Sequence, residues 1–295
     1  SENVDFRLQI EAFNGIAGST NGNGQKNIQV MDAFATWKIC PEFKVRAGQF
    51  YTPLGYENYD ISPATLETVD FSNIVYRIAC RNPYSYNLVD YGRDLGVMII
   101  GDIDKYFHYD FAVTNGSIPC KDDNNNTKDI YASVTIKPFK NFSLHALFTY
   151  QKPVYKNYNA SVTFGDGQKM SVNANNMIVK EIPQILVELD PKYNITDNLN
   201  VWLSFRYFGK TYANLQEALY FNGHWETFGG INWNVNKRLS LGASVINFLN
   251  QKGAKGTISG SELISKADAG KYAGKYMSGS YMRPFTVEFS ANFKF

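Results

Sequence analysis

Charged side chains are spread along this chain in a pattern that predicts a polar passage rather than a catalytic centre. Alternation places Lys44, Arg46, Glu188 and Arg206 on the polar side of predicted strands. A balanced lining gives no strong field, so we expect weak ion selectivity. The alternative is that most of these charges are paired wall residues without an individual role. The other bases and acids expected on that side are Arg7, Lys38, Lys137, Lys210 and Lys294 against Asp5, Glu11, Asp32, Asp110, Asp129, Asp190, Glu226 and Glu288.

The segment 57–90 is the best candidate for a constriction of such a passage. Arginines opposite acids across a narrowed pore create a transverse field that orients polar solutes. The alternative is an extracellular loop that lies on the rim with its charges solvated. The residues that would form the constriction are Arg77, Arg81 and the following Arg93, with the acids Glu57, Asp60, Glu67, Asp70 and Asp90.

The chain offers little for covalent catalysis. Ser143 and His145 share one predicted strand face two residues apart, which separates their side chains by about 7 Å along the strand. That spacing is too long for direct proton transfer, and His224 has no nucleophile motif around it. We therefore expect no enzymatic activity.

The cysteines and histidines form no metal-binding motif. Cys40, Cys80 and Cys120 are an odd set with no Cys-x-x-Cys pair, and the three histidines are scattered. We predict no metal and no cofactor. If a disulfide forms in an oxidising compartment, topology favours Cys80 with Cys120; the alternative is three unpaired thiols.

The elements that must position these residues are β-strands. Apolar and polar residues alternate with period two, and turn residues bound each alternating segment. The pattern predicts an all-β, antiparallel up-and-down transmembrane barrel in a single domain, residues 1–295. The twelve predicted strands lie near 4–11, 28–40, 43–52, 92–102, 105–115, 129–137, 142–151, 184–190, 200–210, 219–235, 239–251 and 285–295.

The connections between these segments alternate in length. In a soluble sandwich nothing requires short and long connections to alternate along the chain. Outer-membrane barrels do have this alternation, because their periplasmic turns are short and their extracellular loops are long. The sequence therefore favours the membrane barrel. The short connections are 41–42, 102–105, 138–141, 194–198 and 236–238, and the long ones are 57–90, 116–127, 156–180 and 253–283.

The last segment alternates strictly from Phe285 to Phe295. Its length suits a tilted strand that crosses a bilayer, for which about 9–11 residues are needed. It resembles the closing strand of bacterial outer-membrane barrels, and that resemblance implies that Phe295 is the signal read by the barrel assembly machinery.

Composition agrees with a membrane barrel and excludes other classes. A net charge of +2 over 295 residues leaves no footprint for nucleic acid. The chain has 20 Tyr and 21 Phe, which suits aromatic girdles at both membrane interfaces. No apolar run approaches the ~18 residues of a membrane helix. The chain opens without a charged and apolar leader, so if it is exported, we expect that a signal peptide has been removed.

Two regions resemble known families. Residues 46–57 read Arg-Ala-Gly-Gln-Phe-Tyr-Thr-Pro-Leu-Gly-Tyr-Glu, and Arg-Asp-Leu-Gly-Val at 93–97 and Ala-Val-Thr-Asn-Gly at 112–116 follow. Residues 28–150 thereby resemble the porin O/P family, which implies a passive, water-filled pore with inward-folded loops. Residues 180–295 are similar to the closing strands of Bacteroidota TonB-dependent receptors, through 221–230, 245–254 and 283–289.

The receptor resemblance does not imply an energised transporter here. Those receptors carry an N-terminal plug inside a 22-stranded barrel, whereas strand-like alternation begins at Val4 in this chain. A phosphate specificity is not implied either, because phosphate-selective members have a strongly basic lumen and this one is balanced.

These observations predict a porin of the bacterial outer membrane, surrounded by lipid, that passes small hydrophilic solutes. Twelve strands are intermediate between filled eight-stranded barrels and wide sixteen-stranded pores, so only small solutes should pass. The alternative is a structural barrel without its own open pore that docks a lipoprotein partner through 253–283, within a larger uptake complex. Homo-oligomerisation is possible in either case.

Overall fold

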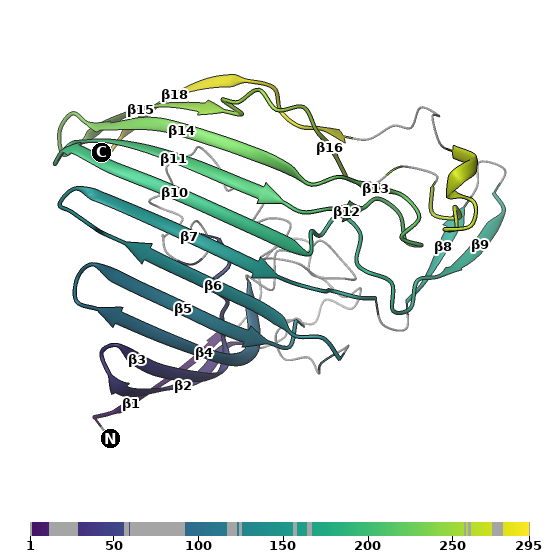
Figure 1. Cartoon of the computed structure of the whole chain (residues 1–295), viewed down its shortest axis with the longest axis horizontal. Helices are drawn as coiled ribbons and strands as arrows, with labels where there is room; N and C mark the ends of the chain where they lie inside the picture. The colour runs from purple at the N-terminus through teal and green to yellow at the C-terminus, as the bar shows by residue number, and fades with distance from the viewer. Residues whose placement is uncertain are drawn as a thin grey trace.

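Twelve strands form one antiparallel sheet in the computed structural model, and each strand pairs with its neighbours in chain order (Figure 1). The structure describes residues 2–11, 29–55, 59, 92–116, 123, 126–155, 158–163, 167–256, 258, 261–272 and 280–294. The strands of the sheet are β1 (Val4–Glu11), β2 (Gln29–Cys40), β3 (Phe43–Tyr51), β4 (Arg93–Ile103), β5 (Phe107–Thr114), β6 (Asp129–Ile136), β7 (Phe142–Tyr150), β10 (Ile185–Thr196), β11 (Leu199–Phe208), β14 (His224–Asn234), β15 (Leu239–Ile246) and β18 (Thr286–Phe293).

The predicted fold class is confirmed, because all twelve predicted segments become strands of this sheet in the predicted order. Three boundaries differ from the prediction. β10 continues past Asp190 to Thr196, and β14 begins only at His224. β15 ends at Ile246 because Asn247 adopts a positive φ of 54°, which turns the chain out of the extended conformation.

The long connections contain structure that alternation did not reveal. They form three two-stranded hairpins and a short 3₁₀ helix, of which only Tyr220–Phe221 falls within a predicted strand, that of 219–235. The pairs are too short, and too mixed in their residue pattern, to give a clear signal. The elements are β8 (Asn159–Thr163) with β9 (Lys169–Asn173), β12 (Thr211–Tyr212) with β13 (Tyr220–Phe221), β16 (Ala254–Lys255) with β17 (Ser280–Tyr281), and η4 (Ala269–Tyr272).

The outer face of the sheet exposes apolar side chains on every strand except β6, whose outward apolar residues are half-buried. Leu95 is 48% exposed, Phe111 42%, Leu203 42% and Trp233 49%. Soluble proteins rarely expose contiguous apolar patches larger than a few hundred Å². A face of this kind, twelve strands wide, therefore requires lipid rather than water.

Aromatic residues collect on the outer face near the short turns. Trp37, Tyr193, Trp233 and Phe293 lie close to the ends of β2, β10, β14 and β18 and are all exposed. Amphipathic rings at this depth are typical of a membrane interface. Among the described residues there is no helix whose length and apolar character would suit a membrane span.

The inner face is defined here as the opposite side of the sheet, and its side chains are largely buried. Phe50, Met98, Ala112 and Leu186 on this face are each 0% exposed. Gly48 and Gly96 pair directly across β3 and β4 on the same face. A Cβ at either position would stand 2.2 or 2.3 Å from a carbonyl oxygen of the next strand, so these glycines permit the close strand approach and sharp twist there.

The two edges of the sheet are β1 and β18. Within the described ranges, each of them pairs with one neighbouring strand only. Phe6 on β1 is 79% exposed and Phe289 on β18 is 82% exposed, more than the outer-face residues of inner strands. β1 starts and β18 ends at the short-turn end, so the two edges run antiparallel to each other (Figure 1).

Candidate channel lining

The register of the sheet places the predicted polar residues on the inner face. Lys44 lies opposite Ile100, Arg46 opposite Met98, and Glu188 opposite Arg206. The pleat sends alternate residues to the same face. These four charged residues therefore lie on the face opposite the exposed apolar side chains, and their role in lining a pore stays a prediction.

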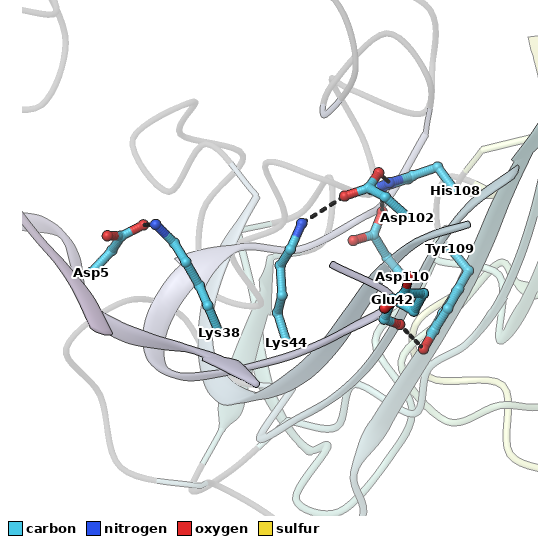
Figure 2. A network of polar contacts seen from close by, with 8 residues as sticks. All are labelled: Asp5, Lys38, Glu42, Lys44, Asp102, His108, Tyr109 and Asp110. Atoms are coloured by element: carbon cyan, nitrogen blue, oxygen red, sulfur yellow. Dashed lines mark hydrogen bonds and ion pairs between the residues drawn. The ribbon is translucent and has the colours of Figure 1, made fainter. Parts of the chain in front are cut away.

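A polar network lies at the short-turn end of β2 to β5 (Figure 2). The Lys44 Nζ atom is 2.6 Å from Asp102 Oδ2, and Asp102 Oδ1 is 2.7 Å from His108 Nδ1. The other ring nitrogen of His108 lies 3.0 Å from Asp110 Oδ2. His108 thus bridges the carboxylates of Asp102 and Asp110 on adjacent strands, and Lys44 forms an ion pair with Asp102.

A second pair continues the charged wall toward β1. Lys38 Nζ lies 2.6 Å from Asp5 Oδ2 across β1 and β2 (Figure 2). Arg46 donates from Nε to Thr36 Oγ1 at 3.1 Å and stacks over the Phe34 ring. The basic side chains of this wall are held by neighbours and do not extend freely.

Asp32 is the hub of a third cluster at the long-loop end of β2 and β4. It is buried and accepts from Arg93 Nε at 2.7 Å, while Arg7 Nε lies 3.0 Å from its other oxygen. Arg93 also stacks over the Tyr51 ring, 3.8 Å from its centroid. Arg93 was predicted to belong to a constriction, and the structure places it against the sheet beside Asp32.

The most deeply buried charges lie on β10, β11 and β14. Arg206 Nε donates to Glu188 Oε1 at 2.8 Å, and both side chains are under 5% exposed. Glu226 stands opposite Arg206 on β14. Charges this deep are tolerated only when they are paired and hydrogen-bonded. The arrangement fits a wall that is rigid and electrically compensated.

Next to this pair, His145 Nδ1 lies 3.4 Å from Asp190 Oδ2. Ligand atoms of His145, Glu188 and Asp190 all lie within 4.8 Å of one another, so this group has the geometry to hold a metal ion. The Arg206 guanidinium already occupies Glu188, which disfavours a second cation. Sequence reasoning missed this grouping because it depends on the register of β7 with β10.

An apolar cluster crosses the inner face between these charged regions. This differs from the expectation of a polar lumen throughout. Leu54, just after β3, is 1% exposed and packs into the cluster, and Tyr59 packs against it. The chain therefore turns inward as it leaves β3. The buried members are Phe50, Leu54, Met98, Ile100, Ala112, Tyr131, Leu147, Leu186 and Phe208.

Most of the predicted constriction lies outside the described residues, so the roles assigned there stay predictions. The same applies to the proposed disulfide partners and to the expected assembly signal. Cys40 is described and is an exposed thiol at the end of β2. The residues concerned are Glu57, Asp60, Glu67, Asp70, Arg77, Arg81, Asp90, Cys80, Cys120 and Phe295.

The long connections of the C-terminal half interlock into a folded cap, which we define as residues 153–182, 211–221 and 253–282 as far as they are described. Its apolar centre includes Tyr155, Val179 and Leu215. Asn214, 0% exposed, donates to two carbonyl oxygens of 261–264 and accepts two backbone N–H bonds. In Figure 1 the cap extends beyond the long-loop end of the sheet, with β8, β9 and η4 farthest from it.

Ion pairs join the segments of the cap. Glu262 accepts from Lys180 Nζ at 2.7 Å and from the Leu215 amide at 2.7 Å. Lys266 Nζ lies 2.7 Å from Glu217 Oε2, and this hydrogen bond raises the pKa of Lys266 above its usual value. The segment 253–283, the docking loop of the alternative hypothesis, is thus partly used to build the cap.

The model of the family described as "Phosphate-selective porin O and P" matches residues 1–99, about a third of the chain. This confirms the porin resemblance for the N-terminal strands, although the match begins earlier and ends earlier than the expected 28–150. No curated protein sequence matches the chain.

Several solved structures share part of the architecture. The ferric-catecholate import receptor Fiu from Escherichia coli K12 is 16% identical with a TM-score of 0.44, over 99% of this chain and 41% of the receptor. The siderophore receptor PiuA from Acinetobacter baumannii is 12% identical with a TM-score of 0.49, over 91% of this chain and 36% of the receptor. The ferric yersiniabactin uptake receptor FyuA from Yersinia pestis is 12% identical with a TM-score of 0.48, over 92% of this chain and 38% of the receptor.

This chain spans about two fifths of the length of these receptors. Like the receptor resemblance of residues 180–295, these likenesses concern the architecture and not the function. The porin match and the exposed apolar outer face place the chain in the bacterial outer membrane, surrounded by lipid. The porin match, over a third of the chain, points to transport rather than catalysis.

Proposed function

We propose that the chain forms a passive, weakly selective channel for small hydrophilic solutes, narrowed by the segment 57–90. The observation that carries this proposal is the packing of Leu54 and Tyr59 against the buried apolar cluster of the inner face. A segment that starts along the inner wall is positioned to narrow the lumen. A loop resting on the outer rim would not begin in this way.

Weak selectivity is supported by the pairing of the wall charges. Asp32 with Arg93, Lys44 with Asp102, and Glu188 with Arg206 each join opposite charges at 2.6 to 2.8 Å. Paired charges largely cancel their fields at a distance of several ångströms. Solutes would therefore be sorted by size more than by the sign of their charge.

Conduction also requires that the edges β1 and β18 pair with each other. In a membrane, unpaired strand edges cost several kcal/mol for each unsatisfied group. Their antiparallel directions and their exposed outer faces support such a closure. The final strand, with Phe295 as the expected signal, would then be the part that the barrel assembly machinery recognises.

The test is single-channel conductance of the refolded chain in planar bilayers, combined with reversal potential in a salt gradient. Heat-modifiable gel mobility confirms that the barrel has folded. We expect discrete conductance steps and a reversal potential near zero. A large reversal potential would contradict weak selectivity.

A second candidate function is a partner-docking barrel, favoured by the folded cap of 153–182, 211–221 and 253–282. An ordered cap offers a defined surface to a lipoprotein or to a second copy of the chain. Absence of conductance from a heat-modifiable barrel that purifies with a stoichiometric second chain would favour this function over the channel.

A further inference from the structure

A groove of about 480 Å³ lies at the short-turn end of the sheet, between two turns and the end of a neighbouring strand. Its walls come from the β4–β5 turn, the β6–β7 turn and the end of β10. Backbone hydrogen bonds tie these walls together: the Lys137 amide donates to Tyr106 O at 2.7 Å, and the Asn194 amide donates to Asn141 O at 2.8 Å. The groove is therefore a built feature of adjacent turns.

The charge of the groove is strongly positive. Lys105, Lys137 and Lys140 line it, and no Asp or Glu does. No carboxylate of the described residues forms an ion pair with any of these lysines; Lys105 instead lies 5.2 Å from the centroid of the Tyr106 ring. Elsewhere at this end, Lys38 and Lys44 are paired with aspartates. The groove thus keeps three ammonium groups available for an anion.

The apolar part of the groove connects it to the membrane face. Phe139 and Phe142 stack with their ring centroids 5.1 Å apart. Phe142 pairs across the strands with Tyr193, an exposed residue of the outer-face aromatic band. The groove therefore lies at the level where lipid headgroups meet the periplasm, and aromatic rings are characteristic of this boundary.

We propose that this groove binds the phosphate headgroup of an anionic phospholipid in the periplasmic leaflet. The ammonium groups of Lys105, Lys137 and Lys140 donate charge-assisted hydrogen bonds to the phosphate oxygens. The rings of Phe139 and Phe142 contact the glycerol and the first methylenes of the acyl chains. A free phosphate ion has no apolar part that could contact the rings of Phe139 and Phe142, so the geometry favours a lipid.

The test is native mass spectrometry of the full chain released from micelles that contain phosphatidylglycerol or phosphatidylcholine. The variant combines Lys105→Gln, Lys137→Gln and Lys140→Gln. The control combines Lys169→Gln, Lys237→Gln and Lys252→Gln, which removes the same charge from exposed positions outside the groove. We expect the groove variant to retain phosphatidylglycerol at least about ten-fold less than the control variant does, with no change for phosphatidylcholine.

A further variant, Phe139→Ala, separates lipid from free anion. It should weaken retention of phosphatidylglycerol while leaving all three lysines in place. Heat-modifiable mobility shows that each variant is folded, and the single lysine variants replace the triple variant if it does not fold. Equal loss in groove and control variants, or displacement of the lipid by millimolar inorganic phosphate, would overturn the proposal. Displacement by an acidic peptide would point to a protein partner and overturn it as well.

Discussion

Replacing Leu54 with Ala tests whether the inward turn after β3 holds the constricting segment in place. Leu54 is 1% exposed and belongs to the inner apolar cluster. Two backbone bonds fix the chain beside it: the Thr52 amide to Gly92 O at 2.9 Å and the Leu54 amide to Thr52 O at 2.7 Å. The leucine is therefore the apolar anchor of a segment whose ends are otherwise joined by hydrogen bonds.

The expected magnitude follows from the burial. Replacing a fully buried Leu with Ala typically costs about 2–5 kcal/mol, because transfer free energy is lost and a cavity remains. A loss of about 3 kcal/mol changes the ratio of docked to undocked segment by roughly 150-fold. If docking narrows the lumen, the variant should spend much more time in a wider state.

The assay is single-channel recording, with the distribution of conductance levels and the open-channel noise as readouts. We expect Leu54→Ala to show a higher mean conductance or frequent transitions to a larger level. The matched control is Leu95→Ala, which removes the same atoms from the lipid-facing side of β4, where Leu95 is 48% exposed. This control should conduct as the unmodified chain does.

Conductance of Leu54→Ala that equals both the control and the unmodified chain, with normal heat-modifiable mobility, would refute the argument. It would mean that the inward turn does not determine the width of the pore. An equal increase in both variants would attribute the effect to general loosening of the barrel instead.

Two further predictions concern buried polar groups. Arg206→Met leaves the buried Glu188 without its 2.8 Å partner and should lower the free energy of unfolding by about 3 kcal/mol. The control is Arg283→Met, at an ion pair with Glu288 whose side chains are 54% and 26% exposed, and it should lower that free energy by less than about 1 kcal/mol. Equal shifts of the two variants in urea midpoints, measured in lipid micelles, would contradict this difference. Asn214→Ala removes four hydrogen bonds inside the cap and should destabilise it locally by about 2–3 kcal/mol. Proteolysis should then cut within 253–283 faster while barrel mobility stays unchanged, and unaltered cleavage would show that the cap does not depend on this residue.

The strands and their faces could be predicted from residue alternation. From Phe43 to Gly48, Phe43, Val45 and Ala47 alternate with Lys44, Arg46 and Gly48, and the structure places Lys44 and Arg46 on the inner face. This works because successive side chains of a strand point to opposite faces of the sheet. The two faces of a strand can therefore be assigned from its own sequence, without knowing which strands pair with it. The lipid-facing surface followed from the same rule.

Groupings across strands could not be predicted in this way. His145, Glu188 and Asp190 meet only because β7 pairs with β10 in one particular register, across the long connection that contains β8 and β9. The cap was missed for a similar reason, since Asn214 contacts residues that follow it by almost fifty positions. Neither pattern is local in the sequence.

The sequence by itself therefore determined the fold class, the number of strands, the polar face and the end that carries long loops. Those properties depend on local alternation and on the chain length between strands. Only the tertiary structure decided that the inner face holds an apolar cluster around Leu54 and that its charges are paired. It also decided that two short turns and the end of β10 enclose the basic groove of Lys105, Lys137 and Lys140. Such features arise from register and from packing between residues far apart in the chain, where no single segment carries the information.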